Sequence, residues 1–130
     1  MRPPPTCSVE TQTVRDVLES IADKWTFVVL DALDDGTMRF SELQRAVGGV
    51  SQKVLTQTLR EMERNGFVVR TVYPEVPPRV EYALSPMGLA LNEAICALWR
   101  WTGENYPDVV KARAAFDART QAAASQAAAS

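Results

Sequence analysis

Residues Ser51 to Gly66 read SQKVLTQTLREMERNG, and this stretch decides the fold. Its apolar side chains recur at helical spacing and form a single stripe made of Val54, Leu55, Leu59 and Met62. Ser51 is a favourable N-cap, and Gly66 is the residue expected where a helix ends in a left-handed turn. The stretch is therefore predicted to be an amphipathic helix whose two ends are both specified.

The opposite face of this helix is polar and carries no acidic side chain before Glu61. Its members are two amides, a hydroxyl and two cations, namely Gln52, Lys53, Thr56, Gln57 and Arg60. Such side chains hydrogen-bond base edges and phosphates in a DNA major groove. At ~1.5 Å per residue the helix is roughly 22 Å long, which suits a groove about 12 Å wide. The face predicts DNA reading, and a cationic solvent-facing surface is the alternative.

Length and composition indicate a single domain with a hydrophobic core. The chain has 130 residues, of which 46% are hydrophobic, so it can fold without disulfides or metal. Its net charge is −2, unlike the strongly basic balance of a general nucleic-acid binder. Between Gly36 and Val80, however, there are seven cations and four acids, a local balance of +3. The middle of the chain is therefore basic, whereas its flanks are acidic.

The composition argues against an enzyme and against a metalloprotein. The chain has no histidine, and its two cysteines, Cys7 and Cys96, lie far apart in the sequence. A zinc site and imidazole catalysis are not expected, and no glycine-rich phosphate loop or nucleophile elbow is found. The start does not resemble a signal peptide, and no apolar run approaches the ~20 residues of a membrane span. We expect a cytoplasmic protein with reduced thiols, no cofactor and no membrane contact.

An arm and two helices are predicted at the start of the chain. Residues 1–10 form an arm that three consecutive prolines keep extended. Apolar residues at helical spacing predict one helix over residues 11–22 and a second, largely buried helix over 25–33. The β-branched residues of the second segment leave a strand as the alternative. Residues 38–40 are compatible with a very short strand.

A helix-turn-helix pair is predicted in the middle of the chain. Ser41 opens the first helix of this pair, with Gln44 completing a capping box. Gly48 and Gly49 then make a tight corner before Ser51. The two helices are thus separated by about four residues, which is the spacing of a helix-turn-helix motif.

The pattern changes from helical spacing to alternation after Gly66. Residues 67–73 and 80–84 alternate in polarity and predict two strands, joined by a loop over 74–79 that contains three prolines. A proline-rich loop cannot serve as another strand, because proline has no amide hydrogen to donate. A helix-turn-helix followed by such a hairpin is a winged helix, so the predicted fold class is α+β and mainly helical.

A long helix is predicted after the hairpin. Ser85 and Pro86 form a strong helix start, and apolar residues over more than one face extend the helix to about Tyr106. Part of that surface is expected to pack against another chain. Pro107 ends or restarts the helix, and QAAASQAAAS at the end is low in complexity and expected to be frayed or disordered. The predicted organisation is an arm, a winged domain with terminal dimerisation helices, one extra helix and a tail, over 1–10, 11–106, 107–120 and 121–130.

Several linked motifs occur in order between Cys7 and Leu91. They are Asp23-Lys24-Trp25, Arg39-Phe40-Ser41-Glu42-Leu43, residues 50–57, residues 59–63, Pro77-Pro78-Arg79-Val80-Glu81-Tyr82 and residues 84–88. With these motifs the chain resembles HxlR-type transcriptional regulators, which are winged-helix proteins close to the MarR regulators. The resemblance implies a homodimer, joined through its terminal helices, that inserts one recognition helix per subunit into successive major grooves of operator DNA.

The resemblance also implies roles for the terminal helices and for the N-terminal cysteine. Candidates for the dimer interface are Val14, Val17, Leu18, Leu91, Ile95, Leu98, Trp99 and Thr102. Some members of the family sense oxidants or electrophiles through a cysteine near the N-terminus, where this chain has Cys7, followed by Ser8 instead of the proline often found there. Cys96 is expected to be an inert core thiol. Core or dimer packing is also expected of the large aromatic residues, with a ligand pocket as the alternative.

The recognition helix supplies the main candidates for DNA contact. Gln52, Lys53, Thr56 and Gln57 are expected to reach base edges from its first two turns. Ser51 could donate its backbone amide to a phosphate at the positive end of the helix, or only cap the helix.

Four arginines are further candidates. Arg60 is expected to contact phosphate, with an ion pair to a nearby acid as the alternative. Arg79, expected near the tip of the wing, should reach the minor groove or its phosphates. Arg70 would contact the DNA backbone or pair with Glu81 across the hairpin. Arg39 would bind a phosphate or form an internal salt bridge.

The preferred function is a sequence-specific transcriptional regulator, more often a repressor, that binds double-stranded operator DNA as a homodimer. Two-fold symmetry requires half-sites about 34 Å apart and therefore a palindromic operator. Its effector, a small molecule or an oxidant, is not identified by the residues. The alternative is a winged-helix protein-interaction module without sequence-specific DNA binding.

Overall fold

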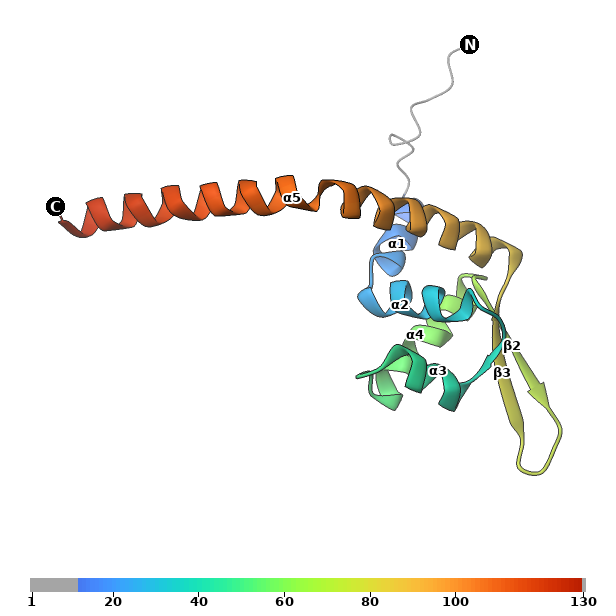
Figure 1. The fold of residues 1–130 in the computed structure, drawn as a ribbon. Coiled ribbons are helices and arrows are strands. Elements are labelled where there is room, and N and C mark those ends of the chain that lie inside the picture. The colour runs from blue at the N-terminus through green and yellow to red at the C-terminus, as the bar shows by residue number, and fades with distance from the viewer. Residues whose placement is uncertain (1–11, 130) are drawn as a thin grey trace, which may run out of the picture. The chain divides into compact units, whose positions relative to one another are not determined.

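The computed structural model describes residues 12–129 and divides into two compact units that meet between Glu93 and Ala94. Each unit is described by itself. The elements are α1 (Gln12–Ile21), α2 (Lys24–Leu33), β1 (Met38–Arg39), α3 (Phe40–Val47), α4 (Gln52–Arg64), β2 (Val68–Tyr73), β3 (Arg79–Leu84) and α5 (Pro86–Ala129) (Figure 1). This order confirms the predicted mainly helical winged helix-turn-helix. The predicted arm, with Cys7, lies outside the described residues.

The second predicted segment is a helix, not a strand. α2 begins after Asp23, whose carboxylate accepts a hydrogen bond from the Trp25 backbone N–H at 2.8 Å. An N-cap of this kind satisfies one of the amides that the first turn of a helix leaves unpaired. The buried side chains of α2 include Val29, Leu30 and Leu33.

α3 begins one residue earlier than the sequence indicated. Phe40 is its first residue, and the backbone N–H of Arg39 donates to the carboxylate of Glu42 at 3.1 Å. The predicted capping box of Ser41 and Gln44 is therefore wrong. β1 ends directly at Arg39, so the helix starts there and the carboxylate three residues further on becomes the partner.

The turn between α3 and α4 depends on glycine. Gly48 and Gly49 have φ angles of 68° and 71°, a region that residues with a Cβ atom rarely adopt. The side-chain amide of Gln44 donates to the Val50 carbonyl oxygen at 3.5 Å across the same turn. These features fix the corner that orients α4.

The wing is a hairpin within a three-stranded antiparallel sheet of order β1-β3-β2. β2 and β3 pair from Val68 with Leu84 to Tyr73 with Arg79. Met38 of β1 pairs with Tyr82, which confirms the very short third strand.

The core of the first unit lies where α2, α3 and α4 meet. Its fully buried members come from these three helices and are Val29, Leu30, Leu33, Leu43, Leu55, Leu59 and Met62. Three of the four residues in the predicted apolar stripe of α4 are therefore buried, and Val54 is half-buried. The stripe leaves the opposite side of α4 exposed.

α5 is one continuous helix that includes Pro107. The predicted break at Pro107 is therefore wrong. The predicted frayed tail is wrong for residues 121–129, which are helical. Pro107 lacks the N–H that would bond to the Gly103 carbonyl, but alanine, the best helix former, dominates the sequence that follows. Helix propensity beyond the proline outweighs one missing hydrogen bond.

Candidate nucleic-acid interface

The first turn of α4 is held as the sequence predicts. Ser51 has extended backbone angles, φ −73° and ψ 156°, and its hydroxyl oxygen accepts a hydrogen bond from the Val54 N–H at 3.1 Å. Gly66 ends the helix with a φ of 81°. Capping at Ser51 leaves other amides of this first turn without helical partners, which is the arrangement that binds phosphate at helix N-termini.

The polar face of α4 is exposed and uncommitted. Gln52, Lys53, Thr56, Gln57 and Arg60 are all exposed. Within the part of the chain that the structure describes, none of them makes a side-chain hydrogen bond or an ion pair. These side chains are thus free to contact an external partner.

Arg60 does not form the ion pair considered as its alternative role. Glu61 instead pairs with Arg64 at 3.3 Å. Arg60 lines a hollow of about 410 Å³ together with Arg70 of β2 and Thr56. The hollow joins the middle of α4 to the wing, and Glu63 and Tyr82 complete its lining.

Arg79 is held within the wing and not at its tip. Its guanidinium lies 4.1 Å from the centre of the Tyr73 ring, and its nitrogens are 3.4 Å from the carboxylates of Glu75 and Glu81. Arg79 is the first residue of β3 and pairs with Tyr73, so the hairpin register places it at the base of the loop. Only 29% of its side chain is exposed, which limits what it can offer to DNA.

Arg70 and Arg39 are better placed for external contacts than Arg79. Arg70 lies opposite Tyr82 and not opposite Glu81, so the predicted cross-strand pair with Glu81 is not formed. Arg39 is exposed and lines a hollow of about 470 Å³ between the start of α3 and the loop of the wing. Its side chain has no ion pair among the described residues.

The candidates for the dimer interface differ in exposure. Leu18, Leu98 and Trp99 are 59%, 50% and 60% exposed, and Thr102 is exposed with its hydroxyl donating to the Leu98 carbonyl oxygen at 2.8 Å. Val14, Val17 and Leu91 are half-buried. Ile95 is only 6% exposed in the single chain, which leaves little of its surface for a partner.

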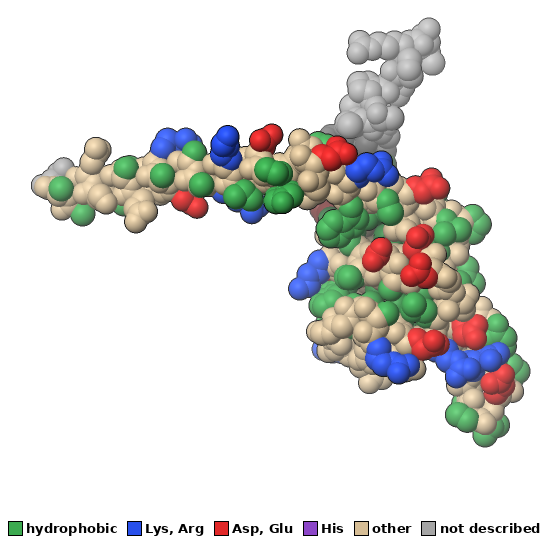
Figure 2. Space-filling model, in the orientation of Figure 1, with side chains coloured by type: hydrophobic (Ala, Val, Ile, Leu, Met, Phe, Trp, Pro, Cys, Tyr) green, Lys and Arg blue, Asp and Glu red, His purple; other side chains and the backbone are tan. Residues whose placement is uncertain are grey.

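Sequence reasoning missed exposed apolar residues beyond Pro107. Val110 and Phe116 are 55% and 59% exposed on α5, and hydrophobic side chains lie along the surface of this helix (Figure 2). The expected break at Pro107 hid them, whereas the seven-residue spacing of Val109 and Phe116 could have revealed a helix face there. Cys96 is exposed, so its expected place in the core is wrong.

Residues 12–129 hold neither a metal-binding cluster nor a membrane-spanning helix. No group of His, Cys, Asp or Glu there is arranged to hold a metal ion. In the same residues, no helix combines the length and the hydropathy needed to cross a bilayer.

Comparison with known proteins places this geometry in a family. The model of the HxlR-like helix-turn-helix family matches residues 20–109. The Escherichia coli K12 protein described as uncharacterized HTH-type transcriptional regulator YtfH is 46% identical over 99 residues, which cover 76% of this chain and 79% of the relative. The structure of a putative transcriptional regulator ytfH from Salmonella typhimurium matches with 45% identity and a TM-score of 0.68, over 77% of this chain and 89% of that one.

A further similar structure is that of the redox regulator HypR in its reduced form. It is 36% identical, with a TM-score of 0.68, and the match covers 78% of this chain and 99% of HypR.

Proposed function

Because the chain belongs to the HxlR-like helix-turn-helix family of transcriptional regulators, we propose that it acts as a homodimer that represses transcription from a palindromic operator. The observation that carries the proposal is the exposed and uncommitted polar face of α4, whose apolar side is anchored in the core. Under this proposal the chain acts in the cytoplasm, with no catalytic role and no cofactor.

The base-reading residues are proposed to be Gln52, Lys53, Thr56 and Gln57. Their support is that they are exposed and lie within the first two turns of α4, the part of a recognition helix that meets base edges. Amide and ammonium groups can bond to purine edges in the major groove.

The phosphate contacts are proposed to come from the helix start and the wing. The backbone amide at Ser51, together with Arg39, Arg60 and Arg70, would hold the DNA backbone and carry no sequence information. Exposure of the three arginines supports this role. We give Arg79 a lesser contact, through the exposed part of its guanidinium, because two carboxylates and a tyrosine ring already surround it.

The homodimer is proposed to form through α1 and α5. The residues of its interface would include Val14, Val17, Leu18, Leu91, Leu98, Trp99 and Thr102. Large apolar side chains exposed along α5 support an interface. Few phosphate contacts give weak binding at physiological salt, whereas two linked helices gain from effective concentration.

A thiol switch at Cys7 is proposed as the regulatory input. The likeness to the redox regulator HypR supports it. Addition of the Cys7 thiolate to a quinone would form a C–S bond and leave the ring as a hydroquinone. Benzoquinone should weaken operator binding by the wild type and by Cys96→Ser, but not by Cys7→Ser. Equal loss in all three proteins would remove Cys7 from the proposal.

Selection from random DNA followed by gel-shift titration tests the proposed reading of bases. Lys53→Ala and Gln57→Ala should each weaken operator binding by about 1–3 kcal/mol, since each removes a base contact. Lys111→Ala and Gln121→Ala are matched controls, because both residues are exposed on α5 and should leave affinity unchanged. Unchanged affinity in the α4 variants, or no preferred sequence in the selection, would contradict the proposal.

A further inference from the structure

The hairpin register brings the end of α4 next to the start of α5. The strands of the wing pair as far as Val68 and Leu84, so Phe67 and Ser85, one residue further out, also lie opposite each other. The Ser85 backbone N–H donates to the Phe67 carbonyl oxygen at 3.0 Å, and the Phe67 N–H closes the end of α4 by donating to the Met62 carbonyl oxygen at 2.9 Å. The two helices are therefore joined where Ser85 meets Phe67.

The side-chain hydroxyl of Ser85 bonds to both helices at this junction. Its oxygen accepts a hydrogen bond from the Gly88 N–H at 3.0 Å, which caps the first turn of α5. Its O–H donates to the carbonyl oxygen of Gly66, the residue that ends α4 with a φ of 81°. A hydroxyl group is both a donor and an acceptor, so one side chain can make the two bonds together. Alanine would lose both of them, whereas threonine carries the same group.

Two further contacts fix the direction of the first two turns of α5, which belong to the first unit. A Cβ atom at Gly88 would collide with the backbone of Phe67, so α5 lies directly on that backbone. One turn later, the side-chain amide of Asn92, which is only 4% exposed, donates to the Asp34 carboxylate at 2.9 Å. Because the start of α5 is attached at two successive turns, its direction against the end of α4 is set.

The junction lies at the opposite end of α4 from the proposed base contacts. α4 has 13 residues, so at ~1.5 Å per residue its first turn lies about 20 Å from Gly66. A rotation of α4 by about 10° at the junction displaces that first turn by roughly 3.5 Å, which is close to the ~3.4 Å rise of one base pair. The direction of α4 against α5 therefore decides which base pair the first turn can reach.

We propose that Ser85 and Asn92 are positioning residues that set the distance between the two recognition helices of the dimer. They contact no DNA themselves, and they make the protein selective for one spacing of the operator half-sites. Leu91, which is proposed to contact the second copy, lies on the same two turns of α5, so the junction links that contact to α4. This inference rests on the proposed function as a dimer on a palindromic operator.

Gel-shift titrations on three operators test the positioning role. One operator keeps the half-site spacing selected from random DNA, and the others have one base pair inserted or removed between the half-sites. The wild type should lose at least about tenfold in affinity on the altered operators, because one base pair moves a half-site by ~3.4 Å and rotates it by about 35°. Ser85→Ala should lose only about threefold, because a looser junction lets α4 follow the displaced half-site. Ser85→Thr should restore the wild-type ratio of affinities.

The ratio of affinities separates positioning from a general loss of stability. A merely structural role would lower the affinity for all three operators by the same factor. Asp23→Ala is the matched control, because it removes a helix cap of the same kind at α2, away from the junction, and should keep the wild-type ratio. Asp34→Ala removes the exposed acceptor of the Asn92 amide and should relax the ratio as Ser85→Ala does. Thermal melts verify that each variant is folded at the temperature of the titration.

The possible failures of this inference and of the proposed function are distinct. A wild-type ratio in folded Ser85→Ala and Asp34→Ala would overturn the positioning role, and if Ser85→Ala did not fold, the ratio of Asp34→Ala alone would decide. Equal affinity of the wild type for all three operators would overturn the selectivity for spacing. Failure of the wild type to bind any operator would instead contradict the proposed function.

Discussion

Single side chains of this protein acquire their roles from their partners, and the partners depend on where each element begins. Ser51 was expected to cap α4 and does so, because the cap needs only the three residues that follow it. Arg79 could not be placed from the sequence. Its ion pairs with Glu75 and Glu81 depend on the hairpin register, which a proline-rich loop of uncertain geometry does not reveal.

Two serines at the starts of the helix-turn-helix helices, Ser51 before α4 and Ser41 in the first turn of α3, should respond differently to substitution. Ser51→Ala removes the acceptor of the Val54 N–H and should lower the free energy of unfolding by about 1 kcal/mol. Ser41→Ala should change it by less than about 0.5 kcal/mol, because the side chain of Ser41 caps nothing. Urea denaturation measures both. Equal losses would show that Ser51 has no special role as a cap.

Arg79 and Tyr73 should be energetically coupled within the wing. The guanidinium lies 4.1 Å from the centre of the ring, a cation–π geometry on a part of the wing that is mostly shielded from solvent. A double-mutant cycle with Arg79→Ala and Tyr73→Ala should give a coupling energy of about 0.5–1 kcal/mol in urea denaturation. Additive single losses would mean that Arg79 is not held by the ring and is available for DNA.

At the scale of elements, most helices and strands were predicted from the periodicity of apolar residues. The change from helical spacing to alternation after Gly66 predicted the wing, and apolar stripes predicted the four helices that precede it. Two boundaries failed for physical reasons. The start of α3 depends on where β1 stops, and the length of α5 depends on alanine propensity that outweighs one proline.

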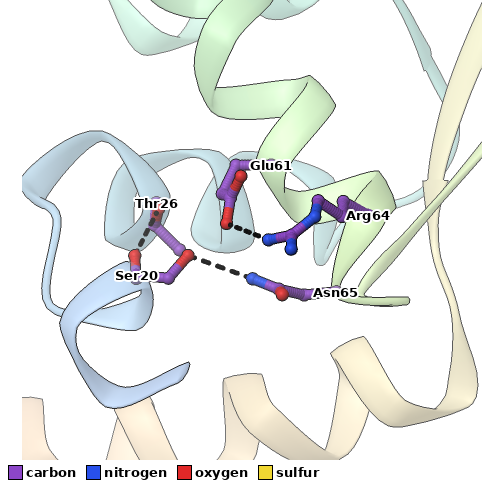
Figure 3. Close-up of polar contacts among 5 residues, drawn as sticks. All are labelled: Ser20, Thr26, Glu61, Arg64 and Asn65. Carbon is purple, nitrogen blue, oxygen red and sulfur yellow. Dashed lines mark hydrogen bonds and ion pairs between the residues drawn. The ribbon is translucent and has the colours of Figure 1, made fainter. Parts of the chain in front are cut away.

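The packing of α1 against the end of α4 was also not predictable from the sequence, because it joins residues that are far apart in the chain. Ser20 of α1 accepts a hydrogen bond from the Asn65 side chain at 3.0 Å, across 45 residues of sequence (Figure 3). Contacts of such long range leave no periodic trace in the chain.

Two glycines of α5 should respond in opposite ways to alanine. A Cβ atom at Gly88 would collide with the carbonyl oxygen of Phe67, so Gly88→Ala should destabilise the protein by about 1–3 kcal/mol. Gly103 has open space around it, and Gly103→Ala should stabilise the helix by up to about 1 kcal/mol. Thermal unfolding of both variants measures these changes in stability. A neutral Gly88→Ala would mean that α5 does not approach the start of the wing as closely as the structure shows.

At the scale of the whole molecule, the proposed function depends on a second copy of the chain. Leu98 and Trp99 on α5 are 50% and 60% exposed. Large apolar side chains exposed together in this way mark a surface that contacts another protein. Leu98→Glu and Trp99→Glu should therefore dissociate the dimer at micromolar concentration, as measured by sedimentation velocity. Arg100→Glu, on the same helix, changes charge without removing apolar surface and should leave the dimer intact. Dimers that persist in the Leu98 and Trp99 variants would place the interface elsewhere.

Operator binding should also depend steeply on salt. Each phosphate neutralised contributes about −0.9 to the slope of log affinity against log salt concentration. Arg39→Ala and Arg70→Ala should each make the slope shallower by about 2 in a dimer, which carries each residue twice, while sequence preference is kept. Slopes that match the wild type would remove these arginines from the phosphate contacts.

The most direct test is hydroxyl-radical footprinting of the pure protein on its selected operator. Two copies of α4 in successive major grooves should protect two half-sites related by two-fold symmetry, with centres about 34 Å, one helical turn, apart. Lys53→Ala and Gln57→Ala should weaken protection of both half-sites together. Protection of a single asymmetric half-site, or an unchanged footprint with both substitutions, would contradict the account.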